Sequence, residues 1–161
     1  MNVLFVCTGN TCRSAMAAAM FDKIVRDNEL DVFIESAGIF AADGEPASDN
    51  AIRAVAKYGV DLSSHRSQPV TEELLKECDL ILTMTEAHKQ ILEQAAPDKV
   101  YTLSEYAGSG GDIKDPYGGD LEEYEETAAE IYDLLTDAAE KIADVAENTE
   151  KTEASKSSGK E

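Results

Sequence analysis

The sequence predicts a single α/β domain in which a four-stranded parallel sheet carries helices on both faces. Three observations lead to this prediction: short continuous apolar runs alternate with amphipathic segments, the chain has 161 residues, and 43% of them are hydrophobic. Short apolar runs are typical of strands covered on both sides, and strands separated by helices pair in parallel. Since a chain of this length can bury one substantial core, we expect one three-layer domain over residues 1–146.

Four apolar runs mark the predicted strands, with helical segments between and after them. The strands are expected at residues 3–6, 31–39, 80–84 and 100–103, and the helices at 15–28, 48–58, from 71, 86–96 and 121–145. Ser48 and Thr71 are predicted N-caps, and Gly59 and Pro97 are predicted stop signals. Ligands of such sheets bind beyond the carboxyl ends of the strands, so the loop after the first strand is a candidate site.

The charge of the chain argues against two classes of partner. There are 33 acidic residues against 14 Lys and Arg, and the formal net charge is −19. Nucleic acids and anionic membranes both need basic side chains, so we expect neither as a partner. The acidity is typical of a solvated surface, and attraction of basic protein substrates is the alternative.

The absence of a visible targeting signal and the cysteine usage predict a cytoplasmic protein, which we also expect to be a monomer. No secretion signal or membrane span is visible, because the N-terminal apolar run is short and has no basic leader. Three cysteines, an odd number, fit a reduced compartment better than a disulfide framework. From residue 147 the composition turns polar and low in complexity, so residues 147–161 are predicted to form a disordered tail.

Residues 7–14 read CTGNTCRS and directly follow the first predicted strand. A Cys-x5-Arg spacing alone is a weak signal, but a strand before it and a helix after it make it specific. Gly9 and Asn10 tolerate the positive φ that a tight loop requires. The segment therefore predicts a loop whose N–H groups converge on an anion at a helix N-terminus.

The same segment supplies the parts of nucleophilic phosphoryl chemistry. A helix N-terminus and Arg13 both favour the nucleophilic thiolate form of Cys7, although a buried inert thiol is the competing interpretation of Cys7 alone. The planar guanidinium of Arg13 can grip two phosphate oxygens, and the Ser14 hydroxyl can donate to the Cys7 sulfur. The residues expected to bind phosphate are Thr8, Gly9, Asn10, Thr11, Cys12, Arg13 and Ser14.

The chain resembles the low-molecular-weight protein tyrosine phosphatase family in three stretches. These are CTGNTCRS, SAGI at residues 36–39, and Asp115-Pro116-Tyr117 in a glycine-rich loop before the last helix. The resemblance covers residues 1 to about 146. It implies a protein phosphatase that acts on phosphorylated proteins, releases inorganic phosphate, and uses no metal or cofactor.

The resemblance also implies a two-step mechanism. The Cys7 thiolate attacks phosphorus and forms a phosphocysteine, while Arg13 and the loop N–H groups stabilise the transition state. Asp115 protonates the leaving group and then acts as base on the hydrolytic water. For Asp115 alone, an ordinary Asp-Pro turn is the competing interpretation.

Within the family, the chain is most similar to the bacterial protein arginine phosphatases. Thr11 stands where tyrosine-specific members usually have a bulkier aliphatic residue, and Phe40 and Tyr117 also fit this branch. We expect all three residues to determine substrate specificity. The competing interpretations are a neutral substitution at Thr11 and a core position for Phe40. Ala15 departs from the proline that many members have, with little expected consequence.

Two supporting sets of residues come from the same resemblance. A hydrogen-bond network behind the loop is expected to join Asn10, Ser14, Ser36 and His65. The competing interpretation of His65 is a surface histidine near a turn. Cys12 is expected to form a reversible disulfide with Cys7 on oxidation. His88 is predicted to be a helix-surface residue without a role, and Cys78 a buried apolar filler. No histidine or cysteine has metal-ligand spacing.

Three alternatives remain open. The first is a tyrosine phosphatase of the same family. The second is an arsenate reductase, which shares this fold but needs two further cysteines, whereas only Cys78 lies downstream. The third is a phosphate-binding module without catalysis, which the presence of Cys7, Arg13 and Asp115 together disfavours.

Overall fold

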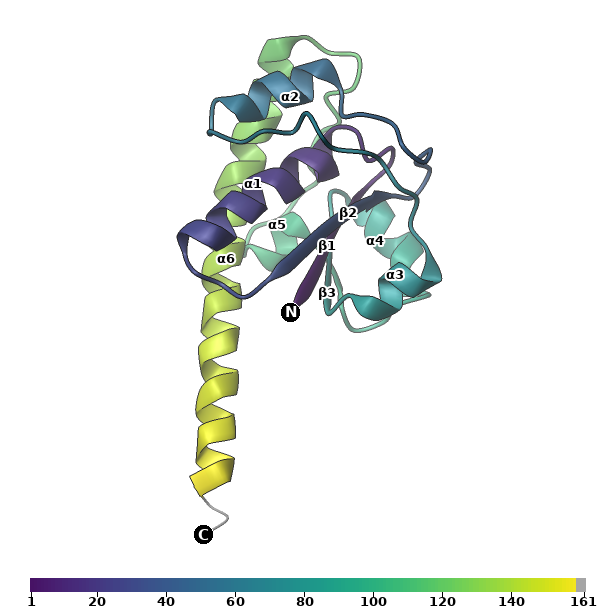
Figure 1. Cartoon of the computed structure of the whole chain (residues 1–161). Helices are drawn as coiled ribbons and strands as arrows, with labels where there is room; N and C mark the ends of the chain where they lie inside the picture. The colour runs from purple at the N-terminus through teal and green to yellow at the C-terminus, as the bar shows by residue number, and fades with distance from the viewer. Residues whose placement is uncertain (159–161) are drawn as a thin grey trace.

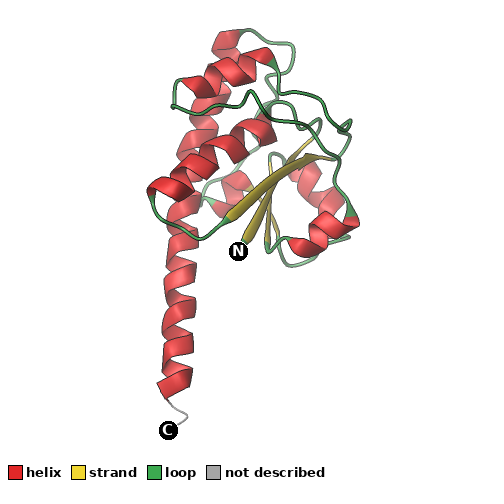
Figure 2. Cartoon of the chain, viewed as in Figure 1, coloured by secondary structure: helices red, strands yellow, loops and turns green. Residues whose placement is uncertain are grey.

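The computed structural model describes the backbone of residues 1–158 and the side chains of residues 1–148 and 152. Four strands form one sheet in the order β2-β1-β3-β4, and every neighbouring pair is parallel. The strands are β1 (Asn2–Cys7), β2 (Phe33–Gly38), β3 (Leu80–Thr83) and β4 (Val100–Thr102). The predicted fold class is therefore confirmed, and Figure 2 shows the strands between helices.

Six helices surround the sheet in the described chain. They are α1 (Arg13–Asp27), α2 (Asp49–Ala56), α3 (Glu72–Glu77), α4 (Glu86–Glu93), α5 (Leu103–Tyr106) and α6 (Leu121–Ser158). Helices α1, α2 and α6 lie together on one side, and α3 and α4 lie on the other (Figure 1). Among residues 1–158, no helix has both the length and the apolar character needed to cross a membrane.

The alternation of side chains along β1 divides the core into two clusters. Val3 and Phe5 pack with α1 and α6, whereas Leu4 and Val6 pack with α3 and α4. All four are fully buried, as expected for the central strand of a three-layer domain. Because Cys7 continues the first set, its side chain belongs to the cluster of α1.

The predicted caps form, and the element ends differ by a few residues. The hydroxyls of Ser48 and Thr71 accept from first-turn N–H groups at 3.3 and 3.1 Å. Helix α4 ends at Glu93, before Pro97, and the short helix α5 was not expected because it follows β4 without a loop.

Helix α6 is longer than the sequence predicts. It continues to Ser158, where the sequence favours an end near residue 145 and disorder from residue 147. Among the residues whose side chains are described, the last buried core residue of α6 is Ile142. The sequence beyond it is rich in Ala, Glu and Lys, which have a high intrinsic helix propensity. The domain boundary at residue 146 stays a prediction, and residues 159–161 lie outside the described chain.

Candidate active site

The candidate site lies at the carboxyl end of β1, the strand beside which the chain order reverses. Strand β2 pairs with one edge of β1 and β3 with the other, so the crossovers leave in opposite directions. Such a switch point leaves a crevice at the strand ends. Cys7 is the last residue of β1, and Arg13 is the first residue of α1. The two parts of the Cys-x5-Arg motif therefore end a strand and begin a helix, as predicted.

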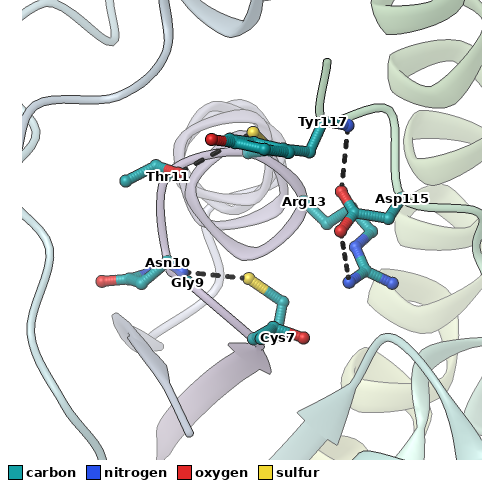
Figure 3. Close-up of a pocket in the computed structure, with 9 residues that line it drawn as sticks. Cys7, Gly9, Asn10, Thr11, Arg13, Asp115 and Tyr117 are labelled. Atoms are coloured by element: carbon teal, nitrogen blue, oxygen red, sulfur yellow. Dashed lines mark hydrogen bonds and ion pairs between the residues drawn. The ribbon is translucent and has the colours of Figure 1, made fainter. Parts of the chain in front are cut away.

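The Cys7 sulfur has two polar neighbours within the loop. The Ser14 Oγ lies 2.8 Å away. The Asn10 N–H donates to the sulfur at 3.3 Å, as Figure 3 shows. The N-cap residue of α1, Cys12, makes no side-chain capping bond, so the first N–H groups of this helix have no capping side chain. A helix N-terminus in this state favours a bound anion and a thiolate.

Asn10 holds the loop from inside. Its Nδ2 donates to Ser14 Oγ and to Ser36 Oγ, both at 2.9 Å, and its Oδ1 accepts from the Gln68 N–H at 3.0 Å. Its carbonyl oxygen lies 2.7 Å from His65 Nε2. The structure thus brings together the four residues expected to share a network, and it adds Gln68.

The backbone of the loop differs from the prediction at one position. Asn10 has a φ of 58°, in the left-handed region that asparagine tolerates. Gly9, which was expected to share this conformation, is not among the described residues with positive φ. The turn is made at Asn10, whose side chain also fixes it.

Arg13 joins the loop to the segment that carries Asp115. The side chain is 5% exposed, and its Nη1 donates to the Ile113 carbonyl oxygen at 2.9 Å. Its Nη2 lies 3.5 Å from Asp115 Oδ2. Asp115 Oδ1 in turn accepts from the Tyr117 N–H at 3.1 Å. The motif arginine and the aspartate are therefore within reach of one another.

A cavity of about 230 Å³ opens between these groups. It is lined by Cys7, Thr8, Gly9, Asn10, Thr11, Cys12, Arg13, Asp115 and Tyr117. Tyr117 is 78% exposed, and Phe40 is 79% exposed, which excludes a core position for Phe40. Phe40 does not line the cavity, although its N–H donates to the Thr8 carbonyl oxygen at 2.9 Å.

His88 is not the helix-surface residue that the sequence predicts. Its side chain is buried, and its Nε2 lies 2.9 Å from Thr8 Oγ1. Burial and, secondarily, the charge of Arg13 lower the pKa of His88. The sequence signal that indicates a buried His88 is its four-residue spacing from Leu92, because residues four apart lie on the same face of a helix. These two are the buried residues of α4.

Gly38 is a second residue of the site that the sequence analysis missed. A Cβ at this position would lie 2.5 Å from the Thr8 carbonyl oxygen and 2.9 Å from the Asn10 nitrogen. The end of β2 therefore has to be a glycine for the loop to pass this close. The SAGI stretch contains this residue, but spacing alone gave no sign of the close approach.

The other two thiols lie in different surroundings. Cys12 Sγ is 3.3 Å from Tyr124 Oη and 3.5 Å from Ser48 Oγ, and burial together with the Cys12 contact raises the pKa of Tyr124 to about 12. Cys78 packs in the cluster of α3 and α4, where burial raises the pKa of its thiol to about 11, as expected of an inert filler. A disulfide between Cys7 and Cys12 stays a hypothesis.

The described side chains contain no group of three or more His, Cys, Asp or Glu residues placed to hold a metal ion. The arrangement can bind an oxyanion and present a sulfur nucleophile to it, with a carboxyl group on the neighbouring loop.

The chain belongs to the low molecular weight phosphotyrosine protein phosphatase family, whose model matches residues 2–150. It is similar to the protein-arginine-phosphatase of Bacillus subtilis, with 44% identity over 146 residues that cover 88% of this chain and 97% of the relative. It is also similar to the low molecular weight protein-tyrosine-phosphatase PtpB of Staphylococcus epidermidis, with 36% identity, covering 84% of this chain and 94% of that one.

The solved structures that match have the same fold. One is the YwlE arginine phosphatase as a Cys-to-Ser mutant with a phosphorylated active-site serine. It superposes with a TM-score of 0.86 at 43% identity and covers 89% of this chain and 96% of that chain. That protein carries a phosphoryl group on the residue that replaces its cysteine.

Proposed function

We propose that this chain is a protein phosphatase that hydrolyses phosphoarginine through a phosphocysteine on Cys7. The main observation that supports this proposal is the position of the Cys7 sulfur, which contacts Ser14 and Asn10 at the N-terminus of α1. Of the two relatives compared above, the protein-arginine-phosphatase has the higher identity, 44% against 36%, which supports phosphoarginine as the substrate. A solved structure named a low molecular weight protein tyrosine phosphatase, from T. tengcongensis, is 45% identical, so the substrate has to be decided by measurement.

In the first step, the Cys7 thiolate attacks phosphorus in line with the leaving group. The S–P bond forms as the bond to the leaving nitrogen breaks, and Asp115 in its protonated form gives that nitrogen a proton. Loop N–H groups and Arg13 hold the equatorial oxygens. This role requires Asp115 to exchange its contact with Arg13 for one with the leaving group, which its half-exposed side chain permits.

In the second step, a water molecule attacks the phosphocysteine. The Asp115 carboxylate takes a proton from the water, the S–P bond breaks, and inorganic phosphate leaves. The Ser14 hydroxyl, 2.8 Å from the sulfur, stabilises the departing thiolate. Asn10, Ser36 and His65 support the loop shape through both steps.

The specificity proposal depends on the walls of the cavity. Thr11 gives one wall a short polar side chain, and Tyr117 lines the cavity from the Asp115 side. Phe40 extends into solvent next to the loop and can contact the substrate peptide. A slim guanidinium stem fits such a cavity at least as well as a phenyl ring.

The test compares kcat/KM for phosphoarginine and phosphotyrosine peptides in the wild type and in Thr11→Ile. We expect the wild type to prefer phosphoarginine and the variant to shift the ratio toward phosphotyrosine by about tenfold, the scale of one or two methyl groups in a pocket. A wild type that prefers phosphotyrosine would establish the alternative from the same family. An unchanged ratio in Thr11→Ile would remove Thr11 from the argument.

The arsenate reductase alternative is disfavoured by the place of Cys78. Its side chain packs in the cluster of α3 and α4, whereas Cys7 belongs to the cluster of α1 and α6. A disulfide relay between them would have to cross the sheet.

We infer a cytoplasmic monomer as the working form. All three cysteines are free, which suits a reducing compartment. Cys7, Arg13 and Asp115 all come from one chain, so the site is complete without a second copy.

A further inference from the structure

His88 forms a polar contact with Thr8, a residue of the cavity wall, that the mechanism above does not use. Thr8 follows Cys7 directly and is one of the residues that line the cavity. Its Oγ1 lies 2.9 Å from Nε2 of His88, which reaches it from α4, a helix on the face of the sheet opposite α1. In the described chain, this is the one hydrogen bond that the Thr8 hydroxyl makes.

The other ring nitrogen of His88 decides the direction of this bond. Nδ1 is buried and has no hydrogen-bond partner among the described residues. A buried N–H without an acceptor is rarer and more costly than a bare nitrogen lone pair without a donor. The neutral tautomer with its proton on Nε2 is therefore favoured, and Nε2–H donates to Thr8 Oγ1.

Burial of the His88 ring, more than the charges around it, favours the neutral form. Arg13, at the start of α1, opposes a second positive charge, whereas Asp112 and Asp115, on the segment before α6, favour it. Burial outweighs the two carboxylates and lowers the pKa of His88. Protonation would also put an unpaired N–H at the buried Nδ1.

We propose that His88 is a positioning residue that turns the Thr8 hydroxyl into a hydrogen-bond donor for the phosphoryl group. Because Nε2–H occupies a lone pair of Thr8 Oγ1, the hydroxyl proton is left free. The cavity that Thr8 lines is where a phosphate oxygen would receive it. The loop then binds phosphate through a side chain as well as through its N–H groups.

The experiment measures inorganic phosphate affinity by calorimetry, and kcat and KM with an aryl phosphate, in matched variants. Thr8→Val should weaken phosphate binding about tenfold, the scale of one hydrogen bond to a charged group, and Thr8→Ser should retain it. His88→Leu should match Thr8→Val, and His88→Gln, whose amide can also donate, should restore most of the affinity. Gln90→Ala, on the exposed part of α4, should equal the wild type.

The double variant Thr8→Val/His88→Leu separates this role from a general effect on folding. If His88 acts through Thr8, the double variant binds phosphate no more weakly than Thr8→Val alone. Additive losses, or wild-type affinity in Thr8→Val, would overturn the proposal. Should His88→Leu fail to fold, Thr8→Val and His88→Gln still decide it, because Thr8 is an exposed residue.

Nitrogen NMR of the wild type tests the tautomer directly. We expect the proton on Nε2 and a titration of His88 below the pH range of an ordinary histidine. A proton on Nδ1 would reverse the bond and overturn the proposal. The inference rests on phosphatase activity, but phosphate affinity is measured without turnover, so a wild type that binds phosphate and hydrolyses nothing would contradict the proposed function alone.

Discussion

The phosphate loop, residues 7–14, and the segment that carries Asp115 contribute to the same cavity, but they are held in different ways (Figure 3). In the loop, Asn10 and Ser14 are fully buried and bonded to one another. The Asp115 side chain is 48% exposed, and its segment is anchored by buried Pro116 and by buried Ile113, whose N–H donates to the Met84 carbonyl oxygen. The nucleophile is thus fixed in advance, whereas the carboxyl group is placed where it can adjust to a leaving group.

Replacing the nucleophile gives the largest expected effect on the fixed region. Cys7→Ser should lower kcat by about 10⁴-fold or more, since an alkoxide is not available from serine in this site. Phosphate affinity, measured by calorimetry, should stay within a few-fold of the wild type, because the N–H groups and Arg13 are unchanged. Undiminished hydrolysis would refute the phosphocysteine, and a wild type without turnover would favour a binding module.

Asp115→Asn tests the adjustable region and should have the next largest effect. We expect kcat to fall by about 10²–10⁴-fold for substrates whose leaving group needs a proton. The loss should be much smaller for an aryl phosphate with an acidic phenol, because that leaving group needs no proton. A burst of phenol release should then show that hydrolysis of the phosphocysteine limits turnover. An equal loss for every leaving group would mean that Asp115 mainly orients Arg13, which lies 3.5 Å away.

Asn10→Ala should give the smallest of these effects on chemistry and the largest on stability. The substitution leaves Ser14 and Ser36 without their amide donor and puts alanine at a φ of 58°. We expect a loss of about 2–3 kcal/mol in the free energy of unfolding by urea denaturation.

Two controls sharpen this measurement. Asn10→Gly removes the side chain without the strain of alanine at positive φ, so it should recover about 1 kcal/mol. Asn148→Ala, at an exposed position of α6 beyond its last buried residue Ile142, should leave stability unchanged. If Asn10→Ala is as stable as Asn148→Ala, the loop is not held from inside.

The fold was predictable because its signals are local. Alternating apolar runs and capping residues such as Ser48 and Thr71 gave the strands, the helices and their parallel arrangement. The pairing of Cys7 with Arg13 could be predicted because one residue ends a strand and the other begins the next helix, so the short loop between them fixes their spacing. Helix α6 extends beyond the prediction since its last residues favour helix through propensity, which a search for an apolar stripe does not detect.

The missed parts of the site depend on contacts between distant segments. His88 lies 80 residues from Thr8, and Gln68 lies 58 residues from Asn10. Nothing in the sequence next to either residue shows which loop it will meet. The polarity of a histidine on a helix favours an exposed position, and the four-residue spacing from Leu92 is the weaker of the two signals.

The missing side chain at Gly38 limits how the loop can vary. An added methyl group would meet the Thr8 carbonyl oxygen, the Asn10 nitrogen and Ala41 Cβ, all within 2.9 Å, and two of these three are main-chain atoms of the catalytic turn. Main-chain atoms cannot rotate away as a side chain can, so the backbone of the loop would have to change its conformation to make room. The curvature around the sulfur is therefore governed from a neighbouring strand, by a residue that contributes no chemical group of its own.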